Sequence, residues 1–246
     1  MDAAAYREMA ALEDRHWWFV GRRRITDALL WRPALPPEAS VLDGCGSGGN
    51  LTMLARYGRL SAGEFDAEAR RLAAARGVAA RVASCELPAV FPFDSERFDL
   101  IVMFDVLEHI EDDLATLAAV RRHLADGGWF VLTVPAFPFL WSPHDTYNHH
   151  FRRYTRAGLM KRLADAGLRP AYCSFFNFWL FPLIALFRTI RKFGRDNEIG
   201  DLAMPPAPIN RVLAALFSSE RFAMGRLSLP FGVSLILTAR APRVGS

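Results

Sequence analysis

The sequence predicts an α/β fold, in which a largely parallel β-sheet is covered by helices on both faces. Between residues 38 and 177, apolar runs of strand length alternate with helical patterns, which is typical of this class. The first apolar run leads directly into a glycine-rich loop at 44–49 that opens a helix. A chain of 246 residues with 52% hydrophobic and 23% charged residues is globular, and neither disordered nor coiled-coil.

Elements are expected in the following order. Apolar and aromatic positions interleaved with charged ones predict helix over residues 1–32, and Pro33, Pro36 and Pro37 end it. A strand at 40–42 and a helix at 51–57 flank the glycine loop. Further strands are expected at 60–65, 78–83, 98–104 and 129–134, with helices at 67–76 and 113–124.

The C-terminal part continues the alternation around an insertion. A polar and aromatic loop at 135–154 precedes a helix at 155–166 and a strand at 170–176, and the last strand is expected at 233–239. We expect one domain over 1–246. Its parts are a helical lid at 1–32, a core at 38–177 and 231–241, and a helical insertion at 178–230 that caps the substrate.

Composition limits the location and partners of the chain. Cys45, Cys85 and Cys173 lie far apart without a C-x-x-C pair, so neither a disulfide framework nor a cysteine zinc site is expected. No signal peptide or spanning helix is recognisable, which favours a cytoplasmic protein. The formal net charge of +4 is spread along the chain without a long basic stripe, so no nucleic-acid partner is expected.

The glycine loop predicts a nucleotide-type site. Gly44, Gly46 and Gly48 follow a strand and precede a helix, which lets a ligand approach backbone amides at the helix N-terminus. Glu64 ends the next strand, where an acidic residue typically accepts hydrogen bonds from ribose hydroxyls. Because Gly44, Gly46 and Gly49 also match a dinucleotide fingerprint, an NAD(P)-dependent oxidoreductase is an alternative, although no second mononucleotide-binding half follows.

At these motifs the sequence resembles the class I S-adenosylmethionine-dependent methyltransferases over nearly its whole length. The segments that carry the resemblance are 41–50 (VLDGCGSGGN) for the first motif, 63–66 for the acidic end of strand two, 98–110 for strand four and 127–135 for strand five. The HWWF opening at 16–19, with the histidine- and arginine-rich loop at 144–154, is similar to a bacterial branch described as quinone-pathway O-methyltransferases.

The resemblance implies a Rossmann-like seven-stranded sheet, mostly parallel with an antiparallel last strand. It also implies S-adenosylmethionine as cofactor and S-adenosylhomocysteine as product. The implied cofactor-binding residues are Asp43, Gly44, Cys45, Gly46, Gly48, Glu64, Phe65, Ser84, Cys85, Phe104, Trp18 and Arg22. Ser84 stands where relatives often carry an aspartate that bonds the adenine amino group, and Cys85 would offer its backbone amide.

The first motif departs from the family pattern by one residue. Asp43 directly precedes Gly44, whereas the family usually has one residue between the acid and the first glycine. The shorter turn would swing the Asp43 carboxylate away from the methionyl ammonium and leave more of the binding to backbone amides. A non-catalytic nucleotide-binding scaffold is therefore another alternative.

The candidate catalytic residues are His144 first, His149 second and Asp105 at the tip of strand four. A hydroxyl acceptor must lose a proton near neutral pH, and histidine suits that task. Asp145 would orient His144, although a purely structural role for this loop has similar weight. The Glu108-His109 pair with the loop histidines could form a divalent-metal site, but a helix N-terminal role for Glu108 is preferred, and no metal is expected.

Two segments predict the surroundings of the site. Residues 16–24 are expected to lie over the cofactor mouth as a lid, with a packed amphipathic helix or a dimer interface as alternatives. The apolar run at 175–187 is followed by basic residues, which predicts core packing, an apolar acceptor pocket, or peripheral membrane contact through 178–195. The leading hypothesis is O-methylation of a small hydrophobic, aromatic or lipid-like acceptor by a monomer or homodimer.

Overall fold

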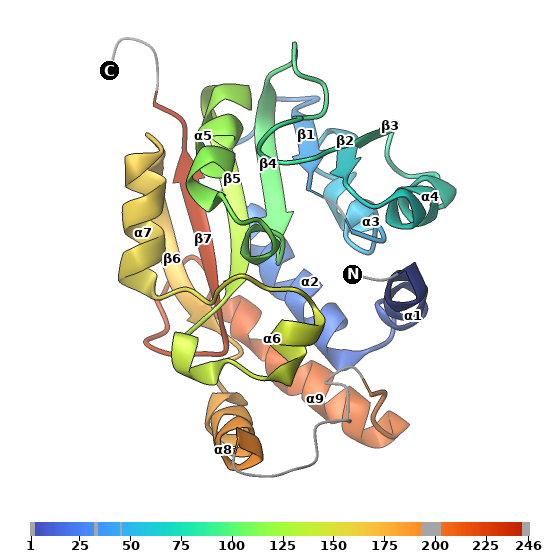
Figure 1. Cartoon of the computed structure of the whole chain (residues 1–246), viewed down its shortest axis with the longest axis vertical. Coiled ribbons are helices and arrows are strands. Elements are labelled where there is room, and N and C mark those ends of the chain that lie inside the picture. The colour runs from blue at the N-terminus through green and yellow to red at the C-terminus, as the bar shows by residue number, and fades with distance from the viewer. Residues whose placement is uncertain (1–2, 32–33, 45, 193–202, 243–246) are drawn as a thin grey trace.

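A computed structural model describes residues 3–31, 34–44, 46–192 and 203–242 and is built around a seven-stranded sheet (Figure 1). The strands are β1 Ser40–Asp43, β2 Arg59–Glu64, β3 Arg81–Ser84, β4 Phe98–Phe104, β5 Leu124–Pro135, β6 Arg169–Phe176 and β7 Ser234–Arg240. Their order is β3-β2-β1-β4-β5-β7-β6. Pairs among β1 to β5 are parallel, and β7 runs antiparallel to both neighbours. The predicted Rossmann-like sheet is confirmed.

Helices connect most of the strands, two further helices precede β1, and two lie between β6 and β7. They are α1 Ala3–Leu12, α2 Trp17–Leu30, α3 Leu51–Leu54, α4 Ala67–Ala75, α5 Asp113–His123, α6 Pro143–Tyr147, α7 Arg156–Asp165, α8 Phe181–Lys192 and α9 Ala207–Ser219. Short 3₁₀ turns lie at Leu107–His109, Pro138–Leu140 and Glu220–Phe222. In the described residues 178–192 and 203–230 the insertion consists mainly of α8 and α9, and α9 packs along α2 (Figure 1).

Each face of the sheet has its own buried core. On one face Leu117 and Val120 of α5 join Leu159 and Leu163 of α7 against the strands. On the other face, α2 and α3 pack with the fully buried Phe217 of α9. Helices cover both faces because the central strands are apolar on both sides, as in parallel sheets generally. Because β1 to β5 are parallel, the loops that follow them gather at one edge of the sheet, the carboxyl edge.

Side-chain caps fix where several helices begin. Asp66 accepts hydrogen bonds from the amides of Glu68 (2.8 Å) and Ala69 (3.0 Å), which starts α4 directly after β2. Asp112 caps α5 through the Ala115 amide at 2.9 Å. These caps set the ends of β2 and of the β4–α5 connection, which both border the site described below.

Besides shifts of strand and helix ends, such as a shorter α3 and a longer β5, the structure differs from the sequence expectations in the N-terminal segment and in the segment after β5. The N-terminal segment is two helices, because the His16 side chain accepts from the Trp18 amide at 3.3 Å and starts α2 anew. The segment at 135–154 contains helix α6, which begins with a capping box between Ser142 and Asp145.

None of the helices in the described part combines the length and the apolar character that crossing a membrane requires.

Candidate active site

A cavity of about 810 Å³ opens at the carboxyl ends of the strands, where the strand order reverses between β1 and β4. Open α/β sheets bind their ligands at such a switch point. One side of the cavity is formed by the glycine loop, the end of β2 and the turn after β4. Residues of α2, the loop at 144–153 and α8 also line it. The cavity wall therefore combines a nucleotide-type glycine loop with side chains from the N-terminal and C-terminal parts of the chain.

Gly46 and Glu64 face each other at the cavity wall. Glu64 accepts hydrogen bonds from the amides of Gly46 (2.6 Å) and Asp66 (2.8 Å). Burial raises the pKa of the Glu64 carboxyl, and these hydrogen bonds oppose the rise. Gly46 has φ +103°, and a Cβ added there would meet no atom within 4 Å, so the backbone borders open space that a side chain would enter.

Asp43 lies behind the loop. Its side chain is 1% exposed, neither carboxylate oxygen has a hydrogen-bond partner among the described residues, and it is absent from the cavity wall. Burial raises the pKa of Asp43 to about 8, although Arg22 lowers it in part. The Asp43 carboxylate is therefore not part of the described cavity wall, and its orientation relative to the cofactor stays a prediction.

Eight of the twelve predicted cofactor residues line the cavity: Gly44, Gly46, Glu64, Phe65, Cys85, Phe104, Trp18 and Arg22. Cys45 falls outside the described residues. Asp43, Gly48 and Ser84 are not part of the described wall. Two of the predicted cofactor contacts compete with contacts inside the protein. The Cys85 amide donates to the Glu64 carbonyl oxygen (3.2 Å), and the exposed Ser84 accepts from Arg70 (3.3 Å). Both groups are used by the β2–β3 edge itself.

Trp18 and Arg22 of the predicted lid line the cavity, and each also contacts another side chain of the protein. Trp18 stacks on Phe217 of α9 with ring centroids 5.2 Å apart. Arg22 forms an ion pair with Asp105, whose second oxygen accepts from the Thr133 hydroxyl at 2.9 Å. Because both Asp105 oxygens are engaged, this carboxylate suits positioning of Arg22 better than proton transfer.

Several imidazoles gather at the cavity wall. His109, His144, His149 and His150 all line it. Asp145 hydrogen-bonds the Nδ1 atom of His150 at 2.9 Å and accepts two bonds from Arg153, at 2.8 and 3.0 Å. Burial would raise the pKa of Asp145, but His150 and Arg153 hold it well below its usual range. The orienting carboxylate therefore serves His150. The expected partnership with His144 is wrong, and His144 Nε2 lies 3.1 Å from the Asn148 amide nitrogen.

Three further cavity residues were not predicted to act in the site, although Glu108 and His109 were considered as metal ligands. Glu108 lies in the 3₁₀ turn at Leu107–His109 and not at the start of α5, so its preferred helix N-terminal role is wrong. Burial, with Asp105 nearby, raises the pKa of Glu108 well above its usual value, and burial lowers that of His109 to about 4. Asn177 is fully buried, and neither side-chain amide atom has a hydrogen-bond partner among the described residues. The sequence signal that could have indicated Asn177 as a site residue is its polar side chain within the apolar run at 175–187.

The comparison with known families gives the class. A family model described as a methyltransferase domain matches residues 15–172, so the chain belongs to this methyltransferase family. No curated protein matches the sequence. The fold, the switch-point cavity and this match together define a class I S-adenosylmethionine-dependent methyltransferase, and the match gives no support to the oxidoreductase alternative.

Solved structures share the fold at low identity. A chain of the complex between the Haloferax volcanii Trm112 methyltransferase activator and a methyltransferase is 22% identical, with TM-score 0.62, over 98% of this chain and 94% of that one. A Bacillus halodurans methyltransferase is 17% identical (TM-score 0.55, 87% and 97% covered). A geranyl diphosphate C-methyltransferase from Streptomyces coelicolor, solved with Mg²⁺ and S-adenosylhomocysteine, is 15% identical (0.55, 88% and 73%). At these identities the likeness is one of fold.

S-adenosylmethionine is the cofactor, and the residues present fit it. The open backbone at Gly46 and the Glu64 carboxylate at the tip of β2 offer the glycine cradle and the acidic acceptor that an adenosyl ligand requires. The resemblance to the quinone-pathway branch stays a prediction.

Proposed function

We propose that the protein methylates a hydroxyl oxygen of a small hydrophobic, aromatic or lipid-like acceptor. The observation that carries the proposal is that four imidazoles, those of His109, His144, His149 and His150, line the same cavity as the glycine loop. A hydroxyl must be deprotonated before it attacks a methyl group near neutral pH, and histidine is the side chain best suited to assist.

The cavity walls support an apolar acceptor. Phe104 and Ile110 come from the β4 side, and Ile184 and Phe187 come from α8 in the insertion. Apolar walls with a few convergent polar groups are typical of small-molecule sites. A cavity with such walls favours a small molecule over a nucleic acid.

Within this proposal the chain's own residues position and deprotonate the acceptor. S-adenosylmethionine supplies an electrophilic methyl group, which transfers in line to the acceptor oxygen. Asp145 holds the Nδ1 side of His150, which leaves Nε2 of that imidazole to accept a proton. His144 and His149, on the same loop, remain candidate bases, and Asp105 holds Arg22 at the cavity wall.

The test is transfer of an isotopically labelled methyl group to a panel of phenols and prenylated phenols, with the methylated atom identified by NMR. We expect an O-methyl product. We also expect His150→Gln to lower kcat by about 100-fold or more, because general-base assistance contributes about 10² to 10⁴. Tyr147→Phe is the control, since Tyr147 is exposed on the same loop and does not line the cavity. Methylation at carbon or nitrogen, or undiminished His150→Gln activity, would contradict the proposal.

A further inference from the structure

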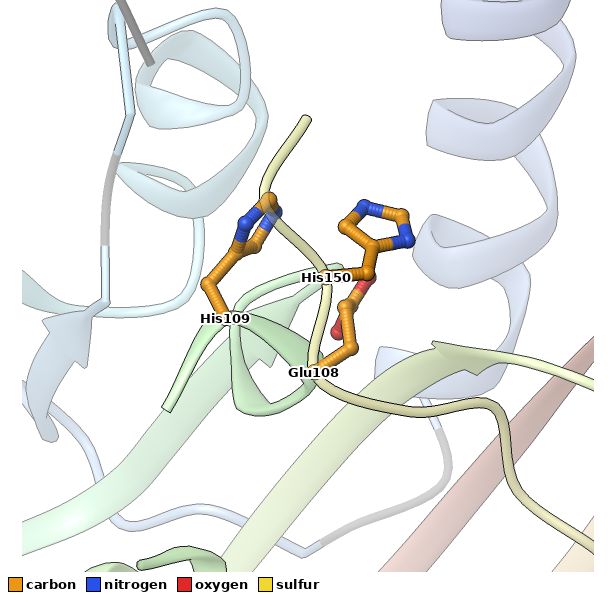
Figure 2. A group of neighbouring side chains, drawn as sticks. All are labelled: Glu108, His109 and His150. Atoms are coloured by element: carbon orange, nitrogen blue, oxygen red, sulfur yellow. The ribbon is translucent and has the colours of Figure 1, made fainter. Parts of the chain in front are cut away.

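Two separate segments bring three metal-binding side chains together in the cavity. Glu108 and His109 come from the 3₁₀ turn after β4, and His150 comes from the loop after α6, as Figure 2 shows. One potential ligand atom from each residue lies within 4.8 Å of the other two. The ring centroids of His109 and His150 are 4.6 Å apart. All three residues line the cavity.

Glu108 has a buried oxygen that lacks a protein partner. The residue is 1% exposed, and its Oε2 atom forms no hydrogen bond within the described structure. An unsatisfied buried carboxylate oxygen is costly, and such groups are usually paired or coordinate a metal. Glu108 therefore points independently to a ligand at this position.

Both histidines are already held in the way that metal-binding histidines usually are. His150 hydrogen-bonds Asp145 Oδ1 through Nδ1 (2.9 Å), and His109 hydrogen-bonds the backbone carbonyl of Asn148. Metal-ligating histidines almost always donate one ring N–H to a carboxylate or a backbone carbonyl, which fixes the tautomer and leaves the other nitrogen for the metal. Each imidazole here keeps one such nitrogen.

The surrounding charges favour a cation. Arg22 is neutralised by Asp105, and Arg153 by Asp145. When these two pairs cancel, the carboxylate that Glu108 forms on releasing its proton to a bound divalent cation meets no unpaired positive charge from Arg22 or Arg153. The two arginines nearest to the cluster therefore do not oppose the binding of a metal.

We propose that Glu108, His109 and His150 bind one divalent cation of the zinc class, with its open side toward the cavity. Two imidazoles and a carboxylate with a fourth position open are a recurrent donor set of catalytic zinc sites. With metal–ligand lengths of about 2.0 Å, tetrahedral ligand atoms lie about 3.3 Å apart. The three side chains therefore need to close by about an ångström or slightly more.

This site rests on the proposed function and deepens it. A cation that contacts the acceptor hydroxyl lowers the pKa of that hydroxyl, so its proton leaves to water. The freed oxygen lone pair then forms the new O–CH₃ bond while the S–CH₃ bond breaks and its electrons return to sulfur. In the metal-loaded protein His150 is a ligand, and the cation takes over the activation that a histidine base would otherwise supply.

The first experiment is calorimetric titration of chelator-treated, full-length protein with ZnCl₂. We expect one site per chain, and we expect Glu108→Gln, His109→Ala and His150→Ala each to weaken binding by about 100-fold or more. His149→Ala is the matched control, because His149 is an exposed imidazole on the same loop outside the cluster and should leave zinc affinity unchanged. Thermal unfolding of each variant verifies folding.

A second measurement keeps the proposal testable where a variant misfolds. Co²⁺ added to the wild-type protein should give visible absorption bands of a nitrogen- and oxygen-ligated ion, and ZnCl₂ should displace them. Absence of these bands, absence of stoichiometric zinc binding, or equal affinity in wild type and all three variants would overturn the metal site.

Activity separates this inference from the proposed function. Stoichiometric zinc binding without O-methylation of any acceptor would support the site and overturn the proposed function. Equal O-methylation rates before and after chelation would support the proposed function and overturn an activating metal.

Discussion

Substitution of Gly46 is a direct residue-level test of cofactor binding at the glycine loop. The φ of +103° at Gly46 and the open space beside it predict that an added methyl group blocks the ligand more than it disturbs the protein. We expect Gly46→Ala to weaken S-adenosylhomocysteine binding by about ten-fold or more, while the left-handed backbone costs about 1 to 3 kcal/mol of stability. Calorimetric titration and thermal unfolding measure the two effects.

Gly77 provides the matched control. It also has a positive φ, +64°, with no atom within 4 Å of an added Cβ, but it does not line the cavity. Gly77→Ala should therefore lose stability in the same range without losing affinity. Equal affinity losses in the two variants would show that Gly46 acts through stability alone.

The buried Asp43 carboxyl predicts a pH-dependent stability. Its pKa is about 8 in the folded protein and about 3.9 in an unfolded chain, so between these pH values the folded state binds more protons. The free energy of unfolding should therefore fall as pH rises from 4 to 8. Asparagine removes this titration, so the advantage of Asp43→Asn over wild type should grow by at most about 1.4 kcal/mol per pH unit.

Chemical denaturation between pH 5 and pH 9 measures this difference. Gly77→Ala, which removes no titratable group, is the control and should differ from wild type by a constant amount. A constant difference for Asp43→Asn as well would contradict the burial argument. The affinity of Asp43→Asn for S-adenosylhomocysteine also shows whether the buried Asp43 carboxyl supports cofactor binding.

At this scale the sequence predicts contacts that follow from strand ends and misses those made by loop folding. Gly46 and Glu64 meet because both follow neighbouring parallel strands, and their spacing alone indicates this. The pairing of His150 with Asp145 depends on helix α6, which the loop composition concealed. Glu108 and His109 reach His150 only through the tertiary fold.

Among the elements, α8 forms most of the segment 178–195 that is predicted to contact a membrane. Residues 193–195 lie outside the described residues. Leu183 and Leu186 are 65% and 59% exposed on α8, while Ile184 faces the cavity. An apolar helix face next to basic residues suits an anionic membrane surface. We expect Leu183→Glu to reduce cosedimentation with phosphatidylserine vesicles several-fold. Val90→Glu is the control, because Val90 is 51% exposed on the β3–β4 connection. Equal binding of the two variants and wild type would exclude α8 as the contact.

The strands were the most predictable elements, because each buried strand is a short apolar run bounded by turn residues. The expected 98–104 agrees with β4 residue for residue. Helix ends were less predictable where a single side chain decides them. His16 divides the N-terminal helix, and the Ser142 and Asp145 capping box creates α6 inside an expected loop.

In the whole molecule, the sheet brings the glycine loop and the β2 and β4 ends to one edge (Figure 1). Residues of α2 and α8 contribute to the wall of the cavity at this edge. The sheet order follows from the α/β pattern and the family resemblance. The packing of α2 against α9 joins segments far apart in sequence, so periodicity alone does not predict it. The central claim is that this edge binds S-adenosylmethionine.

The most direct measurement is calorimetric titration of the purified protein with S-adenosylmethionine, S-adenosylhomocysteine and NADH in parallel. The account predicts one binding site for each adenosyl ligand, competition between the two, and no heat from NADH. Binding of NADH with no heat from either adenosyl ligand would contradict it.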